Sequence, residues 1–135
     1  MFIVDKSAWL SVHRHADLQG EWASALREGQ LATCPIVNLE ILFSARNLDE
    51  FDGWEEDLGV LRMVPVTHAV CLAAIGALRE LIARSQRGIP IADALIAAAA
   101  QDAGCGVLHY DKHYDLLREV LEFESRWIAP RGSIP

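Results

Sequence analysis

The sequence is short of cysteine, and its three cysteines are widely separated. Cys34, Cys71 and Cys105 are odd in number and include no Cys-x-x-Cys pair. Structural zinc sites and disulfide frameworks both need paired or clustered cysteines. The pattern therefore excludes both as organising features and predicts reduced cysteines in the core, with a catalytic thiol as the alternative.

Long apolar runs are also absent. No run approaches the roughly 18 residues of a membrane-spanning helix, and no charged segment precedes a long apolar one as in a secretory signal peptide. We expect a cytoplasmic protein with no membrane partner.

Positive charge is scarce, with 12 Lys and Arg against 19 Asp and Glu and a net charge of −7. This balance argues against a groove that binds nucleic acid mainly through bulk positive potential. It leaves open an enzyme that meets phosphate through bound cations. The acidity can equally be a solubilising surface.

What the chain has is an alternation of short apolar runs and helical patterns over 135 residues, the length of one domain. We predict a single domain over residues 1–135 with a frayed tail after about residue 130. Alternating strands and helices predict an α/β fold with a mainly parallel sheet flanked by helices. The expected strands are 2–4, 31–34, 61–66 and 106–109, with an edge strand over 123–128.

Helix start and stop signals separate these runs. Ser7 is predicted to cap a helix through Val12, and Pro35 to open an apolar helix that includes 36–46. Thr67 is expected to cap helix 68–84, and Pro90 to open an alanine-rich helix ended by Gly104. The other expected helices lie around 18–26, within the acidic segment 47–59, and from His113 to about Val120.

Four acids occupy distinctive places in this pattern. Asp5 and Asp111 each follow an apolar strand, and ligands of open α/β sheets bind at the carboxyl ends of the strands. Glu40 and Asp93 lie on apolar helices, where an isolated carboxylate is costly to bury. Each has an ordinary alternative. Glu40 can belong to a thin polar stripe with Ser44 and Asn47, and Asp93 can simply favour the helix dipole.

If the four acids converge, they need a compensating charge. Two like charges about 4 Å apart repel by roughly 4 kcal/mol at an effective dielectric of 20. A hard divalent cation is the natural compensation, and oxygen ligands favour Mg²⁺, with Mn²⁺ as a substitute. Such an ion can activate water and neutralise charge on a phosphodiester without a dedicated protein base.

Four blocks of the sequence resemble the PIN-domain ribonucleases, and most closely the VapC toxins of type II toxin-antitoxin pairs. The resemblance covers essentially the whole chain. It rests on Ile3-Val4-Asp5-Lys6-Ser7, on Glu40 after the second strand, on the stretch from Ile89 to Ala98 around Asp93, and on the stretch from Leu108 to Asp115 around Asp111.

The resemblance implies a PIN-like three-layer sandwich and a Mg²⁺-dependent endoribonuclease that cleaves structured RNA of the tRNA or rRNA class. Asp5, Glu40, Asp93 and Asp111 would be catalytic, with Asp5 and Asp93 as direct metal ligands and Ser7 assisting. A cognate VapB-type antitoxin, commonly placing an arginine near the acids, and a homodimer are implied as well.

One position departs from the family pattern. Many relatives have a second acid where this chain has His113, which puts a second metal ion in question. Asp115 is a candidate substitute, or it caps the last helix. Candidate phosphate contacts, each also interpretable as a solvated side chain, are Lys6, Arg87, Lys112 and His113.

Two other functions fit parts of the pattern. The first is a PIN-like module that binds RNA or protein without cutting, supported by His113 and the net negative charge. The second is an acidic-pocket phosphatase or phospho-receiver domain. The first strand lacks the paired aspartates of those chemistries, since Asp5 is followed by Lys6 and Ser7, so this function is disfavoured.

Overall fold

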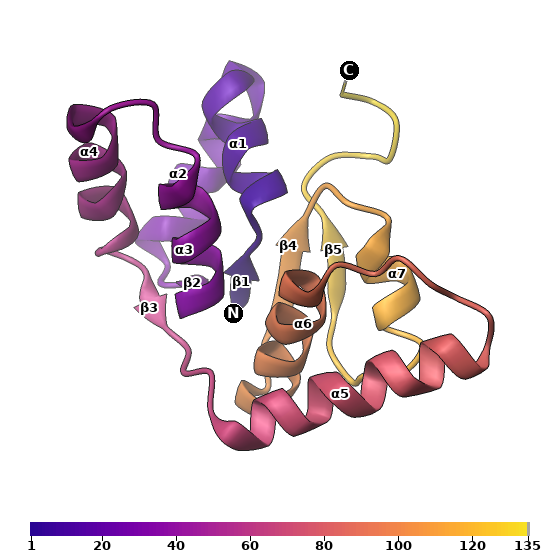
Figure 1. Ribbon diagram of the computed structural model, residues 1–135. Coiled ribbons are helices and arrows are strands. Elements are labelled where there is room, and N and C mark those ends of the chain that lie inside the picture. The colour runs from indigo at the N-terminus through magenta and orange to yellow at the C-terminus, as the bar shows by residue number, and fades with distance from the viewer. Residues whose placement is uncertain (135) are drawn as a thin grey trace.

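A parallel β-sheet runs through the centre of the computed structural model, which describes residues 1–134 (Figure 1). Its strand order is β3-β2-β1-β4-β5, and every neighbouring pair is parallel. Ile3 in the central strand pairs with Ala32 on one side and with Val107 on the other. The strands are β1 (Phe2–Val4), β2 (Leu31–Thr33), β3 (Arg62–Met63), β4 (Gly106–His109) and β5 (Ser125–Trp127).

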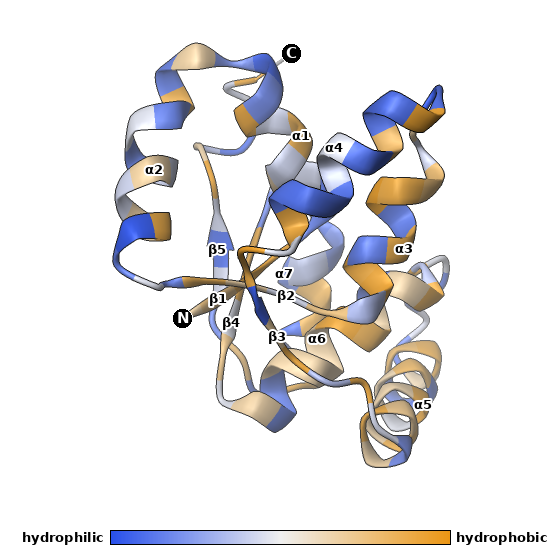
Figure 2. Ribbon diagram, turned by 90° about the vertical axis from the view of Figure 1, so that its left-hand side faces the viewer, coloured by the Kyte–Doolittle hydropathy of each residue, from blue (hydrophilic) through white to orange (hydrophobic). Residues whose placement is uncertain are grey.

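Helices connect each strand to the next, as parallel strands require. Figure 2 shows α2 on one side of the sheet and α3, α5 and α6 on the other. This arrangement confirms the predicted α/β architecture with helices flanking a parallel sheet. The helices are α1 (Lys6–Arg14), the 3₁₀ turn η1 (Ala16–Leu18), α2 (Gln19–Arg27), α3 (Pro35–Phe43), α4 (Leu48–Leu58), α5 (His68–Ala83), α6 (Ile91–Ala103) and α7 (His113–Leu117).

Helix α6 is the centre of the packing. It contacts β1 and β4 and lies against α3, α5 and α7. Ala94 and every residue from Ile96 to Ala100 are fully buried, as the lack of charge between Asp93 and Asp102 predicts. Small side chains let the neighbouring elements approach this helix closely, so its first turn is held in a fixed position over the sheet.

The strand order reverses at β1, because the chain goes from β1 to β2 on one side and β4 lies on the other. The backbone N–H of Asp5 donates to the Leu108 carbonyl at 2.9 Å. The carboxyl ends of β1 and β4 therefore meet at a topological switch point, where α/β sheets form their ligand crevices.

Several predicted boundaries were wrong. The third strand is two residues long instead of spanning 61–66, α3 ends at Phe43 instead of Arg46, and α7 ends at Leu117 instead of continuing to Val120. Helix α3 is also less buried than its apolar sequence predicts, with Leu39 66% and Phe43 92% exposed. None of the helices within residues 1–134 combines the length and apolar character of a membrane-spanning segment.

Candidate metal centre and active site

Asp5 lies at the point where β1 becomes α1, and its carboxylate is fixed by three donors. The Ser7 backbone N–H donates to Oδ2 at 3.0 Å, and the Ser7 hydroxyl donates to the same oxygen. The Tyr114 hydroxyl donates to Oδ1 at 2.7 Å. Asp5 is only 4% exposed. It is also the N-cap of α1, so the prediction that Ser7 caps this helix was wrong. An aspartate accepts the free N–H groups of a first turn as readily as a serine.

The Ser7 side chain joins two parts of the site. Its hydroxyl donates to Asp5 and accepts from the Tyr110 backbone N–H at 2.8 Å. Because Tyr110 begins the loop after β4, this hydroxyl ties the start of α1 to the segment that carries Asp111. Ser7 therefore makes the hydrogen bond to Asp5 through which it was predicted to assist that carboxylate.

Tyr114 is the residue of this site that the sequence analysis missed. It is fully buried on α7, and its ring stacks on His109 with 4.8 Å between centroids. Burial, followed by the charges of Asp5 and Asp93, raises its pKa well above the ordinary tyrosine value. The hydroxyl therefore stays protonated and donates. The sequence signal that could have identified Tyr114 is its place in the first turn of a helix that begins just after Asp111.

Glu40 and Asp93 approach Asp5 from two helices. Burial and then the charge of Asp5 raise the pKa of Glu40, while the charge of Lys6 opposes the rise. Asp93, in the first turn of α6, is 6% exposed. Burial, followed by the charges of Asp5, Asp111 and Glu40, raises the pKa of Asp93 to about 8. Helices α3 and α6 thus direct carboxylates into a negatively charged space.

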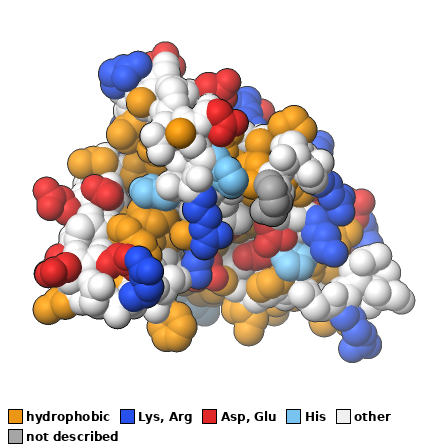
Figure 3. Space-filling model, turned by 90° about the horizontal axis from the view of Figure 1, so that it is seen from above, with side chains coloured by type: hydrophobic (Ala, Val, Ile, Leu, Met, Phe, Trp, Pro, Cys, Tyr) orange, Lys and Arg blue, Asp and Glu red, His pale blue; other side chains and the backbone are white. Residues whose placement is uncertain are grey.

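The predicted convergence of acids is present as two groups that share one residue. Asp5, Glu40 and Asp93 each place a carboxylate oxygen within 4.8 Å of the others. Asp93, Asp111 and His113 do the same with two oxygens and an imidazole nitrogen. Figure 3, which looks onto the molecule from above, shows acidic side chains gathered near the middle of this face with a histidine beside them.

His113 lies between two of the acids. Its Nδ1 is 2.9 Å from Asp111 Oδ1 and 3.1 Å from Asp93 Oδ2. Its backbone N–H also donates to Asp111 Oδ1 at 3.0 Å. The residue predicted as a phosphate contact therefore directs its ring nitrogen toward the acidic centre.

The structure places the remaining predicted residues outside the two groups. Asp115 accepts from Trp127 Nε1 at 3.2 Å and lies 3.9 Å from Arg131 Nη1. Arg87 is exposed on the loop between α5 and α6, beside Leu78 and Ile82. Lys112 is exposed at the start of α7, and Lys6 begins α1 beside Asp5.

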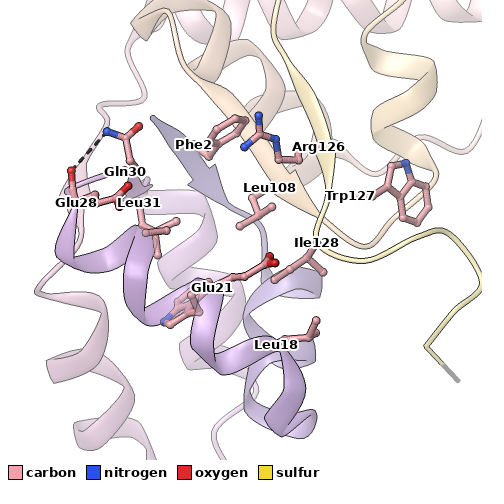
Figure 4. Close-up of a pocket in the computed structure, with 12 residues that line it drawn as sticks. Phe2, Leu18, Glu21, Glu28, Gln30, Leu31, Leu108, Arg126, Trp127 and Ile128 are labelled. Carbon is pink, nitrogen blue, oxygen red and sulfur yellow. Dashed lines mark hydrogen bonds between the residues drawn. The ribbon is translucent and has the colours of Figure 1, made fainter.

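A hollow lies away from the acids, where α2 meets β1, β4 and β5 (Figure 4). Its volume is about 250 Å³, and Phe2, Trp22 and Trp127 contribute aromatic surface to its lining. Arg126 stacks over Phe2 at 4.2 Å from the ring centroid. No acid of the two groups lines this hollow within the described residues, so it is separate from the chemistry at the switch point.

The donor set of the acidic centre fits a hard divalent cation. Its first group offers only carboxylate oxygens, which suit such ions. Three carboxylates so close together repel one another unless protonated or neutralised. Asp5 and Asp93 are the buried members of this group, and they could hold an ion between β1 and α6.

Comparisons with known proteins agree with this geometry. The PIN domain family matches residues 2–120. The chain is 36% identical to ribonuclease VapC18 of Mycobacterium tuberculosis over 99% of both chains. It is 41% identical to ribonuclease VapC51 of the same organism over 78% of this chain and 77% of that protein.

Solved structures share the fold. A chain of the DNA-bound VapBC structure from Salmonella typhimurium superposes with a TM-score of 0.77 at 13% identity, covering 95% of this chain and 98% of that chain. At this identity the likeness concerns the fold alone. Because the family match spans most of the sequence and the curated relatives align along it, the chain belongs to the PIN-domain family and, within it, to the VapC-type ribonucleases.

Proposed function

We propose that this protein is a Mg²⁺-dependent endoribonuclease that acts as the toxin of a toxin-antitoxin pair. One observation carries the proposal. Asp5, Glu40 and Asp93 come from three different elements and bring their carboxylates within 4.8 Å of one another at the switch point of the sheet. The ribonuclease names of the curated relatives support the same activity.

The chain's own residues prepare the site for hydrolysis of a phosphodiester. Tyr114 and Ser7 fix the Asp5 carboxylate, and the packing of α6 fixes Asp93. A divalent cation held by Asp5 and Asp93 would polarise water and neutralise charge on the phosphate. Glu40 and Asp111 would orient water molecules at the edges of the centre, and Lys6 and Lys112 would contact the RNA backbone beside it.

The proposed substrate is a loop of a structured RNA of the tRNA or rRNA class. Proteins recognise RNA sequence mostly in single-stranded loops, bulges and ends, whose unstacked bases are accessible. Figure 3 shows Lys and Arg side chains on either side of the acids. These Lys and Arg side chains can thus contact phosphates even though the whole chain has a net charge of −7.

Two protein partners are part of the proposal. A VapB-type antitoxin would cover the acids with a cationic side chain, because charge complementarity favours that approach. The solved structures of similar fold include toxin-antitoxin complexes, which supports such a partner. A second copy of the chain would cover the exposed apolar stripe of α5, formed by Leu72, Ile75 and Ile82.

The test is RNA cleavage by the purified chain after metal removal, with and without added Mg²⁺. We expect cleavage of tRNA or rRNA only with the metal. Asp5→Asn and Asp93→Asn should each lower the rate by more than about 100-fold, since even outer residues of metal sites cost 10- to 100-fold. The matched control is Asp102→Asn, at an exposed aspartate on the same helix as Asp93.

Retained cleavage in both site variants would contradict the proposal. Metal binding without cleavage of any RNA would favour the non-cutting PIN-like module.

A further inference from the structure

His113 stands where many relatives have an acid, and its surroundings are those of a metal ligand. Its Nδ1 is 2.9 Å from one oxygen of Asp111 and 3.1 Å from one oxygen of Asp93. Asp93 also belongs to the all-carboxylate group with Asp5 and Glu40. The imidazole thus lies beside a second candidate metal position, which shares the Asp93 carboxylate with the first position between Asp5, Glu40 and Asp93.

These separations fit one coordination sphere. In an octahedral centre with metal–ligand distances of about 2.0 to 2.1 Å, neighbouring ligand atoms lie about 3 Å apart. Both nitrogen–oxygen separations of His113 agree with that spacing, and a bound ion would take the place of the hydrogen bond that joins Nδ1 to Asp93. The short segment that carries Asp111 and His113 is further held by the hydrogen bond from the His113 backbone N–H to Asp111 Oδ1.

No other acid on this segment is free for the second position. Asp115, one turn further along α7, is engaged by Trp127 at 3.2 Å and lies 3.9 Å from Arg131. The side chain that remains beside Asp93 and Asp111 is the imidazole, 28% exposed. A neutral imidazole can bind through Nδ1 while Nε2 carries the proton.

We propose that His113 supplies a nitrogen ligand to a second divalent cation, and that this nitrogen makes the second position select a transition-metal ion such as Mn²⁺ over Mg²⁺. Mg²⁺ prefers oxygen ligands, whereas transition-metal ions accept imidazole. The inference rests on the proposed function, because it requires that the acidic centre bind divalent cations. It adds that the two positions differ in chemistry and share Asp93.

The experiment measures metal binding on the full chain after metal removal, without RNA. Mn²⁺ and Mg²⁺ are titrated separately by calorimetry and by the shift in melting temperature, and the Mn²⁺-loaded protein is examined by pulsed electron paramagnetic resonance for coupling to ¹⁴N. The variants are His113→Asp and His113→Gln. The matched control is His68→Gln, at an exposed histidine that begins α5.

We expect the natural sequence to show ¹⁴N coupling and to bind Mn²⁺ more tightly than Mg²⁺. His113→Asp should lose the coupling and lower the Mn²⁺ preference by about 10-fold, the usual lower bound for altering a metal-site residue. His113→Gln should lose the coupling, and His68→Gln should keep both properties.

Absence of ¹⁴N coupling, together with an unchanged metal preference in His113→Asp, would overturn the inference. If Mn²⁺ still raised the melting temperature in that case, the metal centre of the proposed function would stand. If neither metal raised it, the inference and the metal-dependent function would both fail.

Discussion

At the residue scale, Asp5 is the best-fixed member of the acidic centre, and Tyr114 is the reason. A buried phenol that donates to a carboxylate orients it and keeps its other oxygen available to the Ser7 donors. Hydrogen bonds to charged groups stabilise more than neutral ones. Tyr114 reaches Asp5 from 109 positions away in the sequence.

Tyr114→Phe removes this donor while keeping the ring that packs on His109. We expect metal affinity and cleavage rate to fall by about 10- to 100-fold, as for other residues that orient metal ligands. Calorimetric metal titration and initial cleavage rates measure the two effects. Tyr110→Phe is the control, because the Tyr110 hydroxyl bonds to the backbone of Ile134 and not to an acid. Equal losses in the two variants would argue against orientation of Asp5.

Asp93 couples the site to stability. Burial and neighbouring acids raise its pKa to about 8 in the folded state, against 3.8 for the ordinary carboxyl. The folded protein then binds more protons than the unfolded chain between these values. The stabilisation is fully present below pH 3.8 and is lost as the pH rises through about 8.

The resulting prediction concerns the metal-free protein. Its melting temperature should fall as the pH is raised from about 4 to about 8, and added Mg²⁺ should reverse part of the fall by binding the ionised carboxylates. Asp93→Asn should melt at least about 3 °C higher than the natural sequence at pH 8 in EDTA, roughly 1 kcal/mol for a domain of this size. The difference should shrink near pH 4. Scanning calorimetry at both pH values checks it, and a lower melting temperature for the variant at pH 8 would refute it.

At the element scale, the site depends on β1 and β4 lying side by side, and Gly106 permits their approach. A Cβ at Gly106 would lie 2.5 Å from the Phe2 ring and 2.8 Å from the Glu124 carbonyl oxygen. The backbone oxygen cannot yield as a flexible side chain can. This glycine lets the ring of Phe2 lie against β4 at the amino-terminal ends of the strands. The acids lie at the opposite, carboxyl-terminal ends.

Gly106→Ala should therefore destabilise the fold by about 1 to 3 kcal/mol through overpacking. Gly104→Ala provides the matched comparison two residues earlier. Its Cβ meets nothing within 4 Å, so only the backbone φ of 67° opposes it, at about 1 to 2 kcal/mol. Urea unfolding of both variants measures the difference. A Gly106→Ala protein as stable as the natural one would contradict the close contact of Gly106 with the Phe2 ring and the Glu124 carbonyl.

At the scale of the whole molecule, the exposed apolar residues of α5 lie on one stripe. Leu72, Ile75 and Ile82 are spaced by three and seven positions and are 54%, 61% and 50% exposed. Exposed apolar side chains that form a contiguous patch mark an interaction site. Figures 1 and 2 place α5 on the same side of the sheet as α3, which exposes Phe43.

If a second copy covers α5, Ile75→Glu should convert a dimer into a monomer, because a charge opposite its own copy across a twofold interface is repelled and desolvated. Light scattering after gel filtration should give twice 14.9 kDa for the natural sequence and 14.9 kDa for the variant. Val60→Glu, at an exposed valine in the turn after α4, should leave the mass unchanged. A monomeric natural protein would exclude the homodimer.

The sequence by itself determined the order of the elements and the chemical character of the centre. Apolar runs ending in Asp5 and Asp111 predicted carboxylates at strand ends, and the uncharged alanine-rich helix predicted the buried α6, because periodicity and burial are local properties of the chain. The PIN-domain assignment came from the same motifs and agrees with the family match.

Only the tertiary structure decided which side chains meet. The bond from Tyr114 to Asp5, the placement of His113 between Asp93 and Asp111, and the engagement of Asp115 by Trp127 all join residues from different elements. Such contacts depend on how α6 and α7 pack over the sheet, and no local pattern encodes that packing. The shortness of β3 and the exposed stripe of α5 follow from the same cause, since pairing and burial are settled by neighbours distant in the sequence.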